Sequence, residues 1–291
     1  MKKGIIILIL VLLLGIGGIV AIYYFADDTH NLETSLSEPA VTPEIKEYQK
    51  LASLPIKWTD VQTTAELKEL FKEARYDKMP RIFVRRFPDD FASQGNEGLL
   101  ATVLLPHLLR QNQLLQAERA AFLSLADKVN KGIAFTPAED AFWNDLVLKY
   151  EVLNPDKIGQ KEVLFRRIDR LSPSLAVAQS LEATNMGKED LDAPFDVRRW
   201  NDQKQYDFVR YPDLSAAVAD YALELNRGYS YLKFHMLRSY QSRSKRPLRG
   251  RVFARGLGYY KIEDPAYVQK LLGIFDWFQF AAIDEAAFVK E

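Results

Sequence analysis

An apolar segment without charges near the amino terminus constrains this chain more than any other feature. Residues 4–26 contain no Asp, Glu, Lys or Arg. As a helix, this segment would span about 34 Å, and a bilayer's hydrocarbon core is about 30 Å thick. Lys2 and Lys3 precede the segment, and Asp27 and Asp28 follow it. The positive-inside rule therefore predicts residues 1–3 in the cytoplasm, a single transmembrane anchor over 4–26 in a bacterial inner membrane, and the remainder in the periplasm.

A cleavable signal peptide is the alternative for this segment. Signal peptides have a shorter apolar region of about 7–15 residues, followed by a small-x-small cleavage site. Neither Ile19-Val20-Ala21 nor Tyr24-Phe25-Ala26 fits such a site well. The uncleaved anchor is the favoured interpretation.

The residue types that are scarce in this chain exclude several classes of site. There is no cysteine, which excludes disulfides, thiolate zinc sites, iron–sulfur clusters and thiol nucleophiles. Only three histidines are present. We therefore expect no metal site and no cofactor.

The charges balance overall but are unevenly distributed. Lys plus Arg and Asp plus Glu number 39 each, which argues against a general nucleic-acid-binding protein. Residues 225–262 nevertheless contain ten basic residues and no acidic one. This basic segment could contact an anionic surface, such as wall polymer or phospholipid headgroups. The alternative is a basic surface that pairs with acidic residues of the same domain.

Composition and capping patterns divide the rest of the chain. Residues 27–54 are rich in Ser, Thr, Glu and Pro and predict a flexible stalk, which leaves 55–291 as the folded domain. Helical periodicity predicts a long helix over 97–129 and a central, buried helix over 175–186. Alternation around a polar turn at 201–204 predicts a β-hairpin within 195–211. The domain should be mainly α with one small hairpin.

The central helix and its neighbours resemble a known family. Ser172-Pro173 opens this helix, and Gln179 and Gly187 follow at the family's spacing. Further segments whose residues resemble those of the family occur in the family's order at 80–84, 104–106 with Asn112, 221–226, 256–257 with Tyr260, and 267–268. Over about residues 56–280 the chain thus resembles the Bax-like, autolysin-type peptidoglycan glucosaminidases, also described as mannosyl-glycoprotein endo-β-N-acetylglucosaminidase-like domains.

The resemblance implies both a fold and an activity. The fold would be a lysozyme-like α+β domain with a cleft between a helical body and a small hairpin. The activity would be hydrolysis of the β-1,4 bond after N-acetylglucosamine in peptidoglycan glycan strands. This chemistry needs a neutral carboxylic acid beside the leaving oxygen and a second group that positions water or stabilises positive charge.

The chain departs from the family at the catalytic position. The family places its catalytic Glu four residues after the Gln and four before the Gly, and Ala183 occupies that position here. Glu182 is adjacent, but one residue along a helix rotates a side chain by about 100°. Glu182 is therefore either a shifted acid or a solvated residue on the flank of the helix. The family's Trp before the Gly is replaced by Met186, and its Asn-rich stretch reads 192–196 with two Asp residues.

Several other residues are candidates for the cleft. Tyr260 corresponds to a cleft tyrosine of the family and could orient water or sugar. The substrate-binding candidates are Gln179, Phe195, Trp200 and Tyr211, although about half of the aromatic residues at strand spacing should belong to the core.

Three functions follow from these candidates. The favoured one is a catalytically degenerate domain that binds peptidoglycan glycan. The alternatives are an active glucosaminidase that uses Glu182, and a periplasmic scaffold for protein partners.

Overall fold

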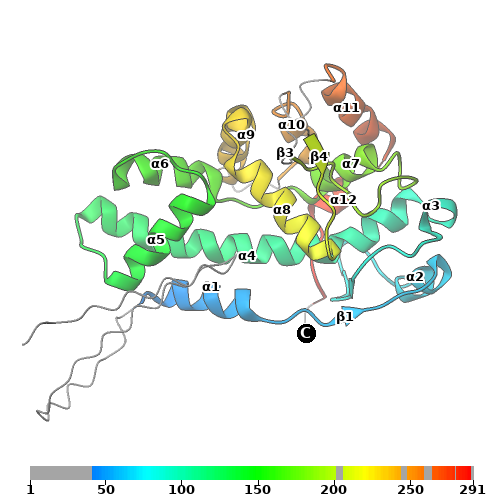
Figure 1. Ribbon diagram of the computed structural model, residues 1–291, viewed down its shortest axis with the longest axis horizontal. Coiled ribbons are helices and arrows are strands. Elements are labelled where there is room, and N and C mark those ends of the chain that lie inside the picture. The colour runs from blue at the N-terminus through cyan, green and yellow to red at the C-terminus, as the bar shows by residue number, and fades with distance from the viewer. Residues whose placement is uncertain (1–40, 201–205, 244–247, 259–263, 279, 290–291) are drawn as a thin grey trace, which may run out of the picture. The chain divides into compact units, whose positions relative to one another are not determined.

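A single long helix, α4 (Glu97–Lys131), runs through the domain and contacts most of its layers (Figure 1). The Asn96 side chain caps its start by accepting a hydrogen bond from the backbone N–H of Leu99 over 2.8 Å. Gly132 ends it in the left-handed conformation, with φ of 64°. The helix predicted over 97–129 is confirmed.

The computed structural model describes residues 41–200, 206–243, 248–258, 264–278 and 280–289. It is mainly helical, as predicted. Besides α4, the helices are α1 (Pro43–Ser53), α2 (Thr64–Leu70), α3 (Phe91–Gln94), α5 (Pro137–Lys149), α6 (Lys157–Arg167), α7 (Pro173–Ala183), α8 (Leu214–Arg227), α9 (Leu232–Arg243), α10 (Gly250–Ala254), α11 (Tyr267–Trp277) and α12 (Ala281–Asp284), with a 3-10 turn, η1 (Tyr229–Tyr231). The strands are β1 (Trp58–Thr59), β2 (Phe83–Val84), β3 (Arg198–Trp200) and β4 (Tyr206–Phe208).

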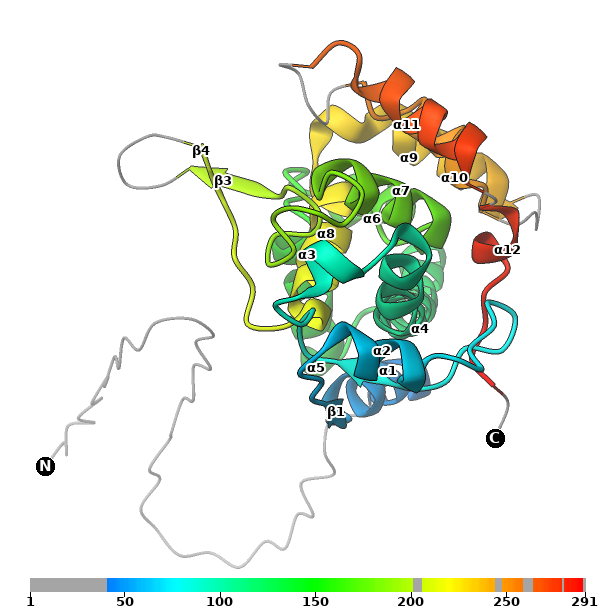
Figure 2. The ribbon, with the colours of Figure 1, turned by 90° about the vertical axis from the view of Figure 1, so that its right-hand side faces the viewer.

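The four strands form two small pairs. β1 and β2 are parallel, with Trp58 opposite Phe83. β3 and β4 are antiparallel, with Arg198 opposite Phe208, which confirms the predicted hairpin. Its turn at 201–204 lies outside the described residues. In Figure 2 the hairpin extends to one side of α7, whereas α10, α11 and α12 lie on the other.

Two hydrophobic cores lie at different parts of α4. The larger core surrounds α7, which contacts α4, α10, α11 and α12. The smaller core joins α1, the second half of α4, α5 and α6 around residues such as Phe122 and Trp143. Residues 39–291 form one compact unit that contains both cores, so this part of the chain has the apolar interior needed to fold on its own.

The flexible stalk expected over 27–54 is wrong in its second part, because α1 packs on α4. Ile45 is fully buried in the smaller core. The Tyr48 hydroxyl donates a hydrogen bond to the buried Glu118 carboxylate over 3.1 Å. Only a few apolar side chains fix this helix, so the polar composition of the segment concealed it.

The predicted transmembrane anchor at 4–26 lies outside the described residues. Over the part of the chain from residue 41 onward that is described, no helix is both long and apolar enough to cross a membrane.

Candidate functional site

The central helix α7 is defined at both ends by local contacts. The Ser172 side chain accepts a hydrogen bond from the backbone N–H of Leu175 over 3.2 Å, and Pro173 occupies the first turn. At the other end, Gly187 has φ of 85° and its N–H donates to the Thr184 hydroxyl over 3.0 Å. Every residue from 173 to 181 is buried, which confirms the prediction of a central, buried helix, although the helix ends at Ala183 and not at Met186 as predicted.

Gln179 links three helices through its side-chain amide. The Tyr221 hydroxyl, on α8, donates to Gln179 Oε1 over 2.6 Å. Gln179 Nε2 in turn donates to the Tyr267 hydroxyl oxygen, on α11, over 2.7 Å. All three side chains are buried, and burial raises the pKa of Tyr221 and of Tyr267 well above the ordinary value, so both remain neutral phenols.

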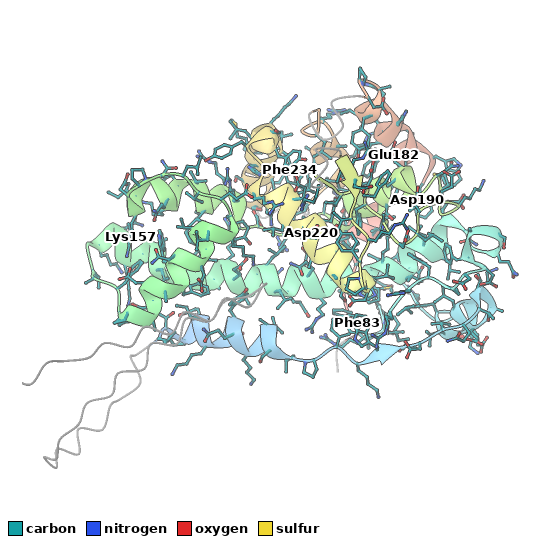
Figure 3. The ribbon with its side chains drawn as sticks, in the orientation of Figure 1. Phe83, Lys157, Glu182, Asp190, Asp220 and Phe234 are labelled. Carbon is teal, nitrogen blue, oxygen red and sulfur yellow. The ribbon has the colours of Figure 1, made fainter. Side chains whose placement is uncertain are left out.

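The end of α7 brings carboxylates toward this network. Glu182 is half-buried in the last turn of the helix, and Figure 3 shows Glu182 and Asp190 at the same end of the domain. The negative charges of Glu182 and Asp196 both raise the pKa of Tyr267 beyond the effect of its burial. The charges of these two carboxylates therefore act on the tyrosine that Gln179 contacts.

The backbone strain of the domain is concentrated in the loop that follows α7. Five of the seven described residues with positive φ lie here: Asn185 (46°), Met186 (62°), Gly187 (85°), Asp190 (45°) and Asp196 (51°). Left-handed conformations are unfavourable for residues other than glycine, and they cluster at ligand sites and active sites. The positive φ angles make this loop a candidate for a functional role.

Charged side chains attach the hairpin and the loop to the domain. Arg199, on β3, lies 3.0 Å from both Asp220 and Glu224, on α8. The Tyr211 hydroxyl also donates to Asp220 over 2.7 Å. Burial and the Asp220 carboxylate raise the pKa of Tyr211. The hairpin is thus fixed against α8, the helix that carries Tyr221.

Ion pairs and hydrogen bonds engage three of the loop's carboxylates. Asp196 lies 2.8 Å from Arg198, and Asp192 pairs with Arg210. Glu189 accepts a hydrogen bond from the Asn185 side chain over 2.7 Å.

The structure corrects two of the substrate-binding candidates. Phe195 is 1% exposed and stacks on Tyr221 with a ring-centroid distance of 4.3 Å, so it belongs to the core. Gln179 is also 1% exposed, and its amide is occupied by two tyrosines. Neither can contact a sugar here, because the interior that packs α7 on α8 and α11 encloses both.

The other candidates have different positions. Tyr211 is half-buried beside α8. Ala183 is half-buried at the end of α7, one helical turn after Gln179. The side chain of Trp200, and Tyr260 altogether, lie outside the described residues.

Sequence reasoning missed the roles of Tyr221 and Tyr267. Both lie in segments that carry the family resemblance, yet nothing local shows that their hydroxyls meet at one glutamine. The available signal was Gln179 itself, because a glutamine inside a helix that is apolar all round requires partners for its amide.

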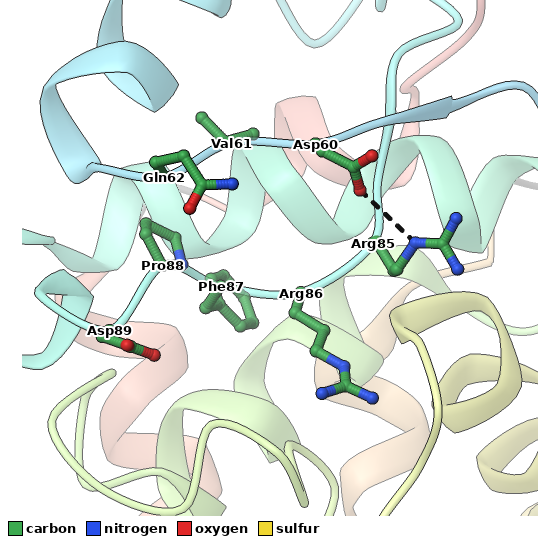
Figure 4. A pocket seen from close by; sticks show the side chains of 8 residues that line it. All are labelled: Asp60, Val61, Gln62, Arg85, Arg86, Phe87, Pro88 and Asp89. Atoms are coloured by element: carbon green, nitrogen blue, oxygen red, sulfur yellow. Dashed lines mark ion pairs between the residues drawn. The ribbon is translucent and has the colours of Figure 1, made fainter.

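Two cavities occur elsewhere in the domain. One, of about 240 Å³, lies between residues 60–62 and 85–89, with Arg85 Nε 3.4 Å from Asp60 (Figure 4). The other, of about 440 Å³, lies between α4 and the carboxy-terminal segment near Phe288. Neither of these two cavities is lined by Gln179 or Glu182. Within the described parts of the chain, no group of three or more His, Asp or Glu residues is placed to bind a metal ion.

Comparison with known proteins does not identify a relative: no family model, no curated protein and no solved structure matches this chain.

Proposed function

We propose that this protein is a membrane-anchored domain of the glucosaminidase type that binds peptidoglycan glycan strands without hydrolysing them. Residues 4–26 would anchor it in the bacterial inner membrane, and residues 39–291 would lie in the periplasm. The observation that carries this proposal is Ala183, which places a methyl group at the end of the central helix where the resemblance requires the general acid.

The carboxylates in the loop after α7 also favour binding over catalysis. A general acid must be a neutral carboxyl group near the leaving oxygen, and removing it costs about 10²–10⁴ in rate. Asp192 and Asp196, the aspartates that replace the family's Asn-rich stretch, are held in ion pairs with arginines. We expect a sugar chain to contact the hairpin, which is fixed against α8, and the strained loop after α7.

A second candidate function, glycan hydrolysis with Glu182 as a shifted acid, is favoured by one observation. Glu182 is half-buried in the last turn of α7, and its charge acts on Tyr267 together with that of Asp196. A scaffold for periplasmic proteins remains the third candidate.

Purified residues 39–291 distinguish these functions in two assays. The proposal predicts co-sedimentation with peptidoglycan sacculi and no clearing of a peptidoglycan zymogram. Clearing that disappears in Glu182→Gln but persists in Glu189→Gln, a change of the same kind in the exposed loop, would instead establish Glu182 as the acid. Absence of both binding and clearing would contradict glycan binding and leave the scaffold.

The anchor has its own test. The full chain should stay with the inner membrane after a high-salt wash, whereas residues 39–291 should be released. Release of the full chain would contradict the anchor.

A further inference from the structure

The outer face of α9 carries an apolar stripe. Leu232, Met236 and Tyr240 are 53%, 60% and 71% exposed, respectively. Their spacing of four residues places them on one side of the helix. Tyr229, in η1 just before α9, adds a ring that is 58% exposed. Solvent-facing positions of a surface helix are ordinarily polar, so this stripe requires an explanation.

The inner face of α9 fixes this orientation. Phe234 is fully buried and packs edge-to-face on Phe253 at 5.7 Å. Arg238 is also fully buried and donates to Asn226 Oδ1 over 2.5 Å and to the carbonyl oxygen of Arg167 over 3.0 Å. Rotation of the helix to bury the stripe would expose Phe234 and leave Asn226 without the guanidinium of Arg238. The stripe is therefore a permanent surface feature.

The stripe lies in a segment of the chain whose charged residues are all basic. α9 lies within residues 225–262, which contain ten basic residues and no acidic one. The structure pairs Arg227, Arg249 and Arg251 of this segment with acidic residues. Lys233, exposed on α9 itself, has no ion pair with any residue that the structure describes. Among the side chains of this segment that the structure describes, the basic charge is thus only partly neutralised.

A second set of exposed apolar residues lies in a segment that is not basic. Leu148, Leu153 and Ile158 are 75%, 79% and 65% exposed. The segment around them, 145–162, contains four acidic and three basic residues. Of these two sets, the stripe on α9 is the one that lies in a basic segment.

The combination of charge and side-chain type favours one partner. A second copy of the chain would oppose two basic surfaces, which repel each other. An anionic bilayer attracts lysine, accepts leucine and methionine at the boundary between headgroups and acyl chains, and accommodates tyrosine at the interface.

We propose that α9 is a docking face for an anionic phospholipid surface, with Leu232, Met236 and Tyr240 in contact with lipid and Lys233 in contact with phosphate. This inference does not depend on glycan binding or on the anchor at 4–26. If the anchor is present, α9 would hold the domain against the membrane that tethers it.

The test uses residues 39–291, so that the predicted anchor cannot contribute, and sedimentation with vesicles. We expect binding to vesicles of equal parts phosphatidylglycerol and phosphatidylcholine, and much weaker binding to phosphatidylcholine alone. Lys233→Gln should weaken binding to the anionic vesicles by about fivefold, the change expected for one lysine near an anionic surface. The triple change Leu232→Ser, Met236→Ser and Tyr240→Ser should weaken it by at least about tenfold, because it removes the apolar contact.

The matched control is the triple change Leu148→Ser, Leu153→Ser and Ile158→Ser, which removes a similar exposed apolar set outside the basic segment. It should bind like the unchanged domain. Equal loss in the control and in the α9 variant would overturn the proposal, as would unchanged binding of the α9 variant. Failure of the unchanged domain to bind anionic vesicles, or an α9-dependent dimer without lipid, would overturn it as well. Because no glycan is present, failure here would leave the sacculus assay unaffected.

Discussion

The side-chain amide of Gln179 donates a hydrogen bond to the hydroxyl oxygen of Tyr267 over 2.7 Å, although the two residues lie 88 positions apart in the chain. The same glutamine accepts a hydrogen bond from Tyr221 over 2.6 Å. A residue predicted as a substrate-binding candidate thus serves as an internal bridge between α8 and α11. It sets the position of the last turn of α7, where Glu182 and Ala183 lie.

This bridge should contribute measurably to stability. Gln179→Leu keeps the approximate volume but leaves the Tyr221 hydroxyl without its acceptor, and an unsatisfied buried polar group costs about 1–3 kcal/mol. We expect urea denaturation of residues 39–291 to show a loss of about 2 kcal/mol. Gln116→Leu, at an exposed position on α4, is the control and should change stability by about 0.5 kcal/mol or less. Equal effects of the two changes would contradict the role of Gln179.

The packing of α1 gives a second prediction. Ile45 is fully buried, so Ile45→Ala should destabilise residues 39–291 by about 2–5 kcal/mol in the same measurement. A flexible stalk would show no loss. Ile158→Ala is the matched control, because Ile158 is 65% exposed and its truncation creates no cavity.

Two buried histidines predict how stability depends on pH. Burial lowers the pKa of His107 and of His235 to about 3, from an ordinary value of 6.5. Below about pH 6.5 the unfolded chain binds protons that the folded chain does not, so the free energy of unfolding falls as the pH falls. Each histidine should account for a loss of about 2 kcal/mol between about pH 7 and pH 5.

Replacement of one histidine tests this dependence. His235 Nε2 lies 2.7 Å from the carbonyl oxygen of Leu225, and glutamine at this position keeps an N–H donor but does not titrate. His235→Gln should therefore reduce the loss of stability between the two pH values by about 2 kcal/mol. Urea denaturation at both pH values measures this change, and an unchanged pH dependence would show that folding does not lower the pKa of His235.

Restoring the acid tests whether the rest of the cleft is competent. Ala183 is half-buried, so a longer side chain at this position has access to solvent. Under the glycan-binding proposal, Ala183→Glu should produce clearing on a peptidoglycan zymogram, with a gain of about 10²–10⁴ in rate. Ala183→Gln has nearly the same size and cannot supply the proton, so it should remain inactive. Clearing by both variants would show that the gain does not come from proton transfer.

The sequence alone predicted the elements whose signals are local. Helical periodicity predicted α4, Ser172 and Gly187 marked the two ends of the segment that contains α7, and the alternation across 195–211 predicted the hairpin. The sequence did not predict α1, because the composition of a short polar segment does not reveal that one isoleucine and one tyrosine pack on α4.

For the candidate site too, the sequence predicted what depends on neighbouring residues and could not predict what depends on contacts between distant segments. The sequence determined which residues occupy the last turns of α7, including the absence of a carboxyl group at 183. Only the tertiary structure decided that Gln179 and Phe195 face inward, that Asp196 pairs with Arg198, and that Leu232 and Met236 face solvent. Secondary structure depends on neighbours along the chain, whereas burial depends on contacts between distant segments, which no local pattern specifies.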